Sequence, residues 1–171
     1  MRRAICALVS VAAFAVSSAC AAPPPPPPPV PAGPTAAEMV AAAAAIDLRY
    51  MEAFGKGDVD GVMATYWNSP NTVSIGPDGM GTRGYDAIKA GFAGMFGSMP
   101  GAKLELTDAR NEAVGDVVLG SGTWKLTIPA KPKPQVMEGR YSDVKARYDG
   151  KWVLVMDHAS VPLPPPPAAK K

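Results

Sequence analysis

The sequence predicts an α+β domain in which three N-terminal helices pack on one face of an antiparallel sheet. Apolar residues first recur at helical spacing, and from Ala102 onward they alternate with polar residues as in strands. The stretch Tyr141–Ser160 fits two long strands around Asp149-Gly150, a dipeptide typical of two-residue hairpin turns. Runs of helices followed by runs of strands are typical of α+β domains.

The first helix is expected to begin at a capping box formed by Thr35 and Glu38, and to end at Gly55 and Gly57. Its apolar residues recur at helical spacing and form one stripe: Ala43, Ile46, Tyr50, Ala53 and Phe54. Asp58 is expected to cap a short second helix. The apolar residues of that helix are Val62, Met63 and Tyr66.

A third helix is predicted from Tyr85 to Pro100, after an extended segment at Asn71–Ile75 and a turn at Pro77-Asp78-Gly79. Its apolar residues share a single face: Tyr85, Ile88, Phe92, Met95, Phe96 and Met99. Four long antiparallel strands are expected to follow, with a turn at Gly115-Asp116 and an exposed loop at residues 131–134.

Two segments, Leu48–Trp67 and Tyr141–Ser160, resemble the NTF2-like superfamily, most closely its SnoaL-like and DUF4440-type members. The resemblance runs from about Ala36 to Pro162 and covers nearly all of the chain that can fold. It implies a strongly curved sheet folded around the first helix, which leaves a conical cavity open at one end. Members use this cavity as an isomerase, cyclase, hydrolase or dehydratase site, as a peptide or protein groove, or as a dimerisation scaffold.

Residues 1–19 are interpreted as a signal peptide, because Arg2 and Arg3 precede an apolar stretch too short to span a bilayer. The ending at residues 17–20 resembles a bacterial lipobox, with Ser17 at the usual leucine position, and would make Cys20 the lipidated first mature residue. Ordinary signal cleavage after the triplet 19–21 is the alternative. We therefore expect an exported protein, either an outer-membrane lipoprotein facing the periplasm or a soluble periplasmic or secreted protein.

Fourteen of the twenty prolines lie in two stretches, residues 23–34 and 162–167, at the two ends of the folding domain of residues 35–162. Residues 20–34 are predicted to be a proline-rich linker in the polyproline II conformation, which would act as a spacer. Residues 163–171 are predicted to be a proline-rich, disordered tail.

The net charge and the small number of metal-ligating side chains exclude some classes of function. Without Arg2 and Arg3 the chain has fifteen basic and fifteen acidic residues, a balance that gives no electrostatic case for binding nucleic acid. The folding domain has one histidine and no cysteine, so no metal site and no cofactor are expected. The expected partners are a small-molecule ligand, a second copy of the chain, and a membrane only through a lipid anchor at Cys20.

The resemblance implies roles for particular residues. Ketosteroid-isomerase-like members use a tyrosine of the first helix and a strand carboxylic acid as hydrogen-bond donors to an oxyanion, and Tyr50 and Asp143 match these positions. Their proton-moving aspartate belongs on the strand after the second helix, where this chain has Ile75. Isoleucine can neither accept nor deliver a proton, so an enzyme of this kind would need Asp157 or His158 as its base.

The register of the last hairpin decides which residues face the cavity. A two-residue turn places Tyr141 opposite His158 on one face of the sheet, and Asp157 opposite Ser142 on the other face, where Arg140 is its diagonal neighbour. One β-bulge would exchange these faces, so the sequence leaves both pairs open as cavity residues. The pocket is also expected to include Trp67, Phe92 and Phe96.

Two functions remain. The sequence favours a non-catalytic module that binds a small apolar or amphipathic ligand, or a partner, because the familiar base is missing. The alternative is a cofactor-independent enzyme of the SnoaL or ketosteroid isomerase type, an isomerase, cyclase or dehydratase with Tyr50, Asp157 and His158 as catalytic residues. An enzyme would bring two titratable groups together at one ligand-sized cavity, whereas a binding module would have an apolar cavity or none.

Lipidation is testable at the N-terminus of the native protein. We expect mass spectrometry to find cleavage between Ala19 and Cys20 and the added mass of acyl chains on Cys20. A mature chain that starts at Ala22 and carries no lipid would instead establish ordinary signal cleavage.

We also expect the mature domain to be a homodimer. The predicted outer face of the last strand carries Trp152, Leu154 and Met156, which a monomer would expose to water. Equilibrium sedimentation should give the mass of two chains, and a monomer mass that does not change with concentration would contradict the prediction.

Overall fold

The computed structural model describes residues 33–162. The expected signal peptide, the lipidation site at Cys20, most of the linker and the tail at 163–171 lie outside these residues. Within the described range, no helix is long and apolar enough to cross a membrane.

The first two helices begin and end at the residues whose side chains or conformations favour such boundaries. Helix α1 spans Ala36–Lys56, and its capping box forms through Thr35 Oγ1, which accepts from Glu38 N at 3.3 Å, and Glu38 Oε2, which accepts from Thr35 N at 2.7 Å. The helix continues through Gly55 and ends at Gly57, whose φ of 65° suits a residue without a Cβ. Helix α2 is Val59–Met63, with Asp58 as its N-cap.

Helix α3, Tyr85–Ser98, buries only part of the apolar face that its spacing predicts. Ile88 and Phe92 are buried in the core. The remaining residues of the face are partly buried against it: Tyr85, Met95, Phe96 and Met99. The helix therefore lies at the margin of the core, where one side of it can border a cavity.

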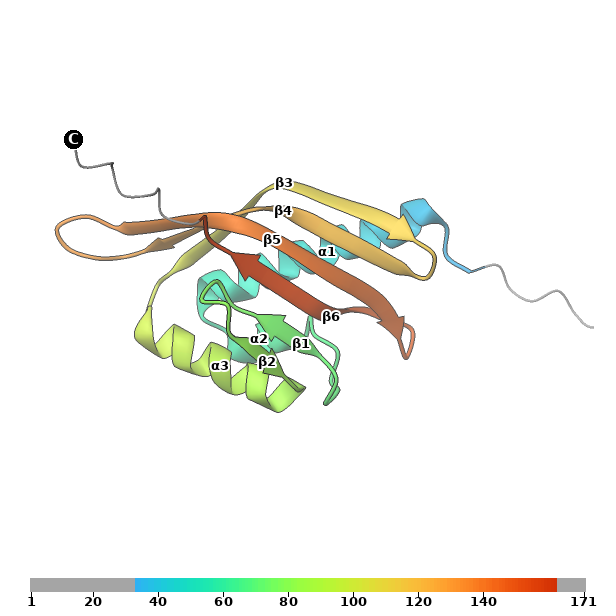
Figure 1. The fold of residues 1–171 in the computed structure, drawn as a ribbon, viewed down its shortest axis with the longest axis horizontal. Coiled ribbons are helices and arrows are strands. Elements are labelled where there is room, and N and C mark those ends of the chain that lie inside the picture. The colour runs from blue at the N-terminus through green and yellow to red at the C-terminus, as the bar shows by residue number, and fades with distance from the viewer. Residues whose placement is uncertain (1–32, 163–171) are drawn as a thin grey trace, which may run out of the picture. The chain divides into compact units, whose positions relative to one another are not determined.

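The sheet has six strands in the order β2-β1-β6-β5-β4-β3 (Figure 1). The four long strands are antiparallel to one another, as predicted: β3 is Lys103–Val114, β4 is Val117–Ile128, β5 is Gln135–Tyr148 and β6 is Lys151–Ser160. The short strand β1, Val73–Ile75, pairs in parallel with β6, so the sheet is mixed rather than purely antiparallel. Strand β2, Gly81–Arg83, was not predicted, because three residues are too few to show a period.

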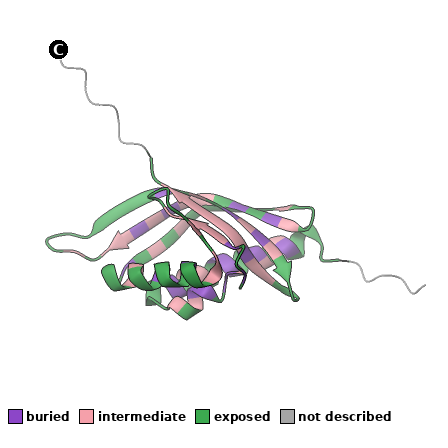
Figure 2. Ribbon diagram, turned by 60° about the horizontal axis from the view of Figure 1, so that its bottom comes forward, coloured by how far each residue is buried: buried purple, intermediate pink, exposed green. Residues whose placement is uncertain are grey.

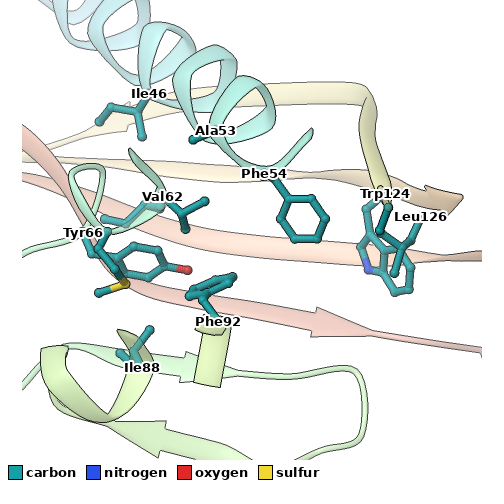
Figure 3. Packing of buried hydrophobic residues seen from close by; sticks show 12 residues of the cluster. Ile46, Ala53, Phe54, Val62, Tyr66, Ile88, Phe92, Trp124 and Leu126 are labelled. Atoms are coloured by element: carbon teal, nitrogen blue, oxygen red, sulfur yellow. The ribbon is translucent and has the colours of Figure 1, made fainter. Parts of the chain in front are cut away.

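The helices cover the concave face of the sheet and enclose the core. Helix α1 lies along β3 and β4, while α3 lies beside the β1–β2 hairpin (Figure 1). The buried residues of α1 face the sheet (Figure 2). In Figure 3 the core gathers aromatic rings from both layers, with Phe54 on α1, Phe92 on α3 and Trp124 on β4.

Three glycines allow large side chains to lie flat on the concave face. A Cβ on Gly120 would overlap the Asp143 carboxylate, and a Cβ on Gly139 would meet the Trp124 ring and a backbone carbonyl. A Cβ on Gly122 would lie 2.7 Å from Tyr141 Cε1 and 2.9 Å from the Thr107 carbonyl oxygen. The missing side chains on β4 and β5 thus make room for Tyr141, Asp143 and Trp124.

A bulge in β6 changes the register that the sequence predicts. Lys145 pairs with Leu154 but Val144 pairs with Met156, so Val155 has no partner on β5. Beyond the bulge Tyr141 lies opposite Ala159 and not His158, and Asp157 lies opposite Asp143 and not Ser142, so Arg140 is on the other face from Asp157. The predicted Tyr141–His158 and Arg140–Asp157 pairs are therefore both wrong. The physical reason is the extra residue, which a count back from the turn cannot include.

The face of β6 that carries Trp152 and Leu154 is the inner one, which removes part of the argument for a dimer. Leu154 is buried in the core and Trp152 packs against it, so neither is on the outer face. The outer face instead carries an apolar row across neighbouring strands: Leu119, Val144, Met156 and Val73. The homodimer remains a prediction, now with this row as its contact surface.

The glycine clearances predict opposite effects for two alanine substitutions. Gly122→Ala should destabilise the protein by about 1–3 kcal/mol, because the backbone at Thr107 cannot move away as a flexible side chain would. Gly94→Ala is the control: no heavy atom lies within 4 Å of its Cβ position on α3, so it should stabilise by up to about 1 kcal/mol. Urea denaturation measures both, and a shift of the same sign in the two variants would contradict this view of β4.

Candidate functional site

A cavity of about 520 Å³ opens between the helices and the concave face of the sheet. Its walls are mostly apolar and come from α1, α3, β3, β4 and the β1–β2 hairpin. The apolar and aromatic lining residues include Tyr50, Phe54, Ile88, Phe92, Met95, Leu104, Leu106, Trp124, Leu126 and Leu154. A cavity of this size and lining suits a small, largely apolar molecule.

Four carboxylates border the cavity: Asp47 on α1, Asp143 on β5, Asp157 on β6 and the exposed Asp78 in the turn between β1 and β2. Asp143 and Asp157 are register partners on adjacent strands, so their side chains share the concave face. Among the described residues, no lysine or arginine borders the cavity. The polar part of the wall is therefore acidic.

Lys145 is fully buried beneath these acids. Its Nζ lies 2.8 Å from Asp47 Oδ1, and 2.8 and 2.9 Å from the two carboxylate oxygens of Asp143. It also donates to Asn111 Oδ1 at 3.2 Å, while Asn111 Nδ2 donates to Asp47 Oδ2 at 2.9 Å. These four side chains form a closed network that links α1, β3 and β5, and it satisfies the lysine completely.

Asp157 is the carboxylate that this network leaves out. Its Oδ1 is buried and has no hydrogen-bond partner among the residues that the structure describes. Burial raises the pKa of Asp157 to about 6, with a smaller contribution from Asp143, while the hydroxyls of Ser74 and Tyr66 oppose the shift. Burial also raises the pKa of Asp143, but there Lys145 opposes the shift. The two carboxyls thus differ because only Asp143 has a cation beside it.

Three tyrosine hydroxyls surround the acids. Burial, together with the nearby Asp157, raises the pKa of both Tyr50 and Tyr66, and burial with Asp47 and Asp143 raises that of Tyr141. All three therefore stay protonated at neutral pH and are available as donors. The hydroxyls of Tyr66 and Tyr141 have no hydrogen-bond partner within the described part of the chain. Tyr66 lies beside Phe92, with ring centroids 5.9 Å apart (Figure 3).

The structure brings together some of the expected pocket residues and separates others. Tyr50, Phe92, Asp143 and Asp157 line the cavity. His158 borders it, but alternation along β6 directs its side chain to the face opposite that of Asp157.

Three expected residues do not line the cavity. Arg140 is exposed and lies opposite Ser160. Trp67 stacks on Tyr148, with ring centroids 4.2 Å apart. Phe96 packs against Phe54 in the core, with ring centroids 5.0 Å apart.

The absence of a carboxylate at Ile75 matters less than the sequence suggests. In the parallel pair of β1 and β6, Ser74 lies opposite Asp157 and Ile75 opposite His158. The neighbouring strand therefore supplies a carboxylate one strand away from the position where ketosteroid-isomerase-like proteins would carry it.

Sequence reasoning missed Asp47, Asn111 and Lys145, and gave Trp124 and Tyr141 no firm place in the pocket. One signal was available: Tyr141, Asp143 and Lys145 alternate along one strand, which puts all three on one face. A second was the spacing of Asp47 and Tyr50, which places them on one side of α1. Asn111 lies beyond a register shift in β3, so no sequence period reveals its direction.

No group of three or more His, Cys, Asp or Glu side chains in residues 33–162 is arranged to hold a metal ion.

A family model for the SnoaL-like domain matches residues 48–155. An NTF2-like superfamily protein from Salmonella enterica serovar Typhimurium LT2 has a similar structure, with a TM-score of 0.69 and 21% identity over 79% of this chain and 99% of that one. A candidate dehydratase of the NTF2-like family from Streptomyces avermitilis has a TM-score of 0.70 and 17% identity, over 76% of this chain and 100% of its own.

A protein of unknown function from Mycobacterium tuberculosis is also similar, with a TM-score of 0.67 and 18% identity over 77% of this chain and 81% of that one. At these identities the structural likenesses show the fold alone. No curated protein sequence matches the chain significantly.

Replacing Lys145, which lies in the buried network, should destabilise the protein far more than replacing the exposed Lys89. Lys145→Met should destabilise by about 3–5 kcal/mol, because it leaves two buried carboxylates without their cation. Protonation of Asp143, whose pKa burial raises, relieves the repulsion, so the loss should be smaller at pH 5 than at pH 8. The control is Lys89→Met, which breaks an exposed pair with Asp60 and should leave stability nearly unchanged. Equal losses in the two variants would refute the role of the network.

Proposed function

The chain belongs to the SnoaL-like domain family of the NTF2-like superfamily, and on this premise we propose that its cavity binds a small apolar or amphipathic molecule and moves a proton on it. Asp157 is the proposed base and Tyr50 the proposed hydrogen-bond donor. Both groups belong to the chain itself, so the proposal needs no cofactor.

The proposal rests on the position, the hydrogen bonding and the pKa of the Asp157 carboxyl group. Its carboxyl borders the cavity, has a buried oxygen without a partner, and has a pKa of about 6. A base is most effective when its pKa is near the working pH, and at neutral pH this group is largely ionised and ready to accept a proton. A carboxylate neutralised by lysine, as Asp143 is, would be a weaker base.

The proposed step follows from the two groups. Asp157 takes a proton from an acidic C–H or O–H bond of the bound molecule, and the electron pair of that bond stays on the molecule. Tyr50, held protonated by burial, donates a hydrogen bond to the oxygen that gains negative charge. Asp157 then returns the proton at a second position, which is isomerisation, or delivers it to a departing hydroxyl group, which is dehydration.

The sequence favoured binding without turnover, and this remains the second candidate. It was favoured because Ile75 replaces the familiar base, whereas Asp157 offers a carboxylate from the next strand. The cavity meets the criterion stated for an enzyme, since Tyr50 and a carboxylate border one ligand-sized space. Binding alone is supported by the apolar walls and by the presence of just one concave-face carboxylate, Asp157, that Lys145 does not pair with.

The proposal can be tested with 2-tetralone, an apolar ketone with acidic C–H bonds. In D₂O the wild-type protein should exchange these hydrogens faster than buffer, with a rate that rises from pH 5 to 7 as Asp157 ionises and then levels off. Asp157→Asn should slow the exchange at least about a hundredfold, and Tyr50→Phe about tenfold. Proton NMR measures the rate.

His158→Ala is the control, because its side chain is directed away from Asp157, and its rate should stay within about twofold of wild type. Exchange that survives in Asp157→Asn would refute the proposed base. Binding of 2-tetralone without any exchange, with Tyr50→Phe costing only about 1 kcal/mol of affinity, would favour the binding module.

A further inference from the structure

We infer that the acidic end of the cavity is a cation subsite, which takes the ammonium group of an amphipathic amine. This inference rests on the proposed function only in one respect: the same cavity must bind a ligand. It adds the charge of that ligand, which neither the family nor the fold assigns.

Acidic side chains outnumber basic ones at this end of the cavity. Asp47, Asp143 and Asp157 border the cavity together with the exposed Asp78, and Lys145 is the single cation of the described residues that pairs with any of them. Lys145 is fully buried and donates to Asp47, Asp143 and Asn111. At neutral pH the acids outnumber the cation, and Asp157 is the acid of the concave face without a counterion.

Polar atoms that lack hydrogen-bond partners also favour a ligand that donates hydrogen bonds. Within residues 33–162, Asp157 Oδ1 is a buried acceptor with no hydrogen-bond partner, and the Tyr141 hydroxyl on the next strand is also without one. A buried polar atom without a hydrogen bond is unfavourable, and a ligand that donates to it removes this cost. An ammonium group has three donors, enough for the carboxylate oxygen and for a hydroxyl oxygen beside it.

Aromatic side chains form part of the cavity lining. Tyr50, Phe92 and Trp124 border the same cavity, and Tyr50 and Phe92 meet edge to face with centroids 6.1 Å apart. Ring faces attract cations, and they also cover the hydrocarbon part of an amphipathic ligand. An acid beside several rings is the arrangement that an organic ammonium ion fits better than an inorganic one.

The same features predict how ligands with other polar groups rank in affinity. A hydroxyl group can donate once to Asp157 but brings no charge to balance it. A carboxylate would meet four acids and no basic side chain among the described lining residues. The expected order of affinity is therefore ammonium, then hydroxyl, then carboxylate.

The test uses three tetralin derivatives that share one two-ring skeleton and differ at carbon 2: an ammonium, a hydroxyl or a carboxylate group. Titration calorimetry of the wild-type domain at pH 7.5 should give the ammonium compound at least tenfold tighter binding than the alcohol, and no measurable binding of the carboxylate. In Asp157→Asn the ammonium compound and the alcohol should bind within about threefold of each other. Asp116→Asn is the matched control, since it removes an exposed acid at the β3–β4 turn and should keep the tenfold preference.

A pH series on the wild type gives a second readout that needs no variant. The amine probe stays charged between pH 5 and 7.5, whereas Asp157, with a pKa of about 6, loses its charge. The other groups facing it are Asp143, Tyr141 and Lys145 on β5, Asp47 and Tyr50 on α1, and Tyr66 after α2, with His158 next to it on β6. Amine affinity should fall at least fivefold at pH 5, and alcohol affinity less than twofold.

The outcomes separate the two proposals. Equal affinity for the three compounds, or tighter binding of the carboxylate, would overturn the cation subsite and leave the binding cavity intact. A preference for the amine that persists in Asp157→Asn and at pH 5 would also overturn it. Failure of all three compounds and of 2-tetralone to bind would overturn both. Amine preference without any proton exchange on 2-tetralone would support the subsite and contradict the proposed catalysis.

Discussion

The buried ammonium group of Lys145 is the interaction on which the rest of the site depends. It binds Asp47 on α1 and Asp143 on β5, and Asn111 on β3 completes the network, so three elements are fixed relative to one another. A buried ion pair of this kind is costly to break because the remaining charges have no water around them. Because Lys145 pairs with Asp47 and Asp143, Asp157 is the concave-face carboxylate that has no cation beside it.

Two backbone features then determine what the cavity contains. The bulge at Val155 turns Asp157 and Ala159 toward the concave face and His158 away from it. The glycines of β4 let Tyr141 and Asp143 lie close to the sheet, where a side chain on β4 would otherwise displace them. Without the bulge, β6 would present a histidine to the cavity, and a different chemistry would follow.

The fold could be predicted from sequence to a large extent, because its signals are local. The capping box at Thr35, the glycine at position 57 and the turn at Asp149-Gly150 each act within a few residues, and the structure has them as expected. The site could be predicted only in part. Tyr50 and Asp143 followed from family resemblance, but the place of Asp157 depends on one unpaired residue, and Lys145 meets Asp47 across nearly a hundred residues of chain. Such contacts leave no period in the sequence.

The central claim is that Asp157 is an unneutralised carboxylate within the cavity, and a carbon-13 NMR titration of its carboxyl carbon tests this most directly. The assignment follows from the resonance that disappears in Asp157→Asn. The account predicts a pKa of about 6 for this carboxyl in the empty protein. A value near that of an ordinary exposed aspartate, about 4, would contradict it, because it would mean that water or a counterion already stabilises the charge.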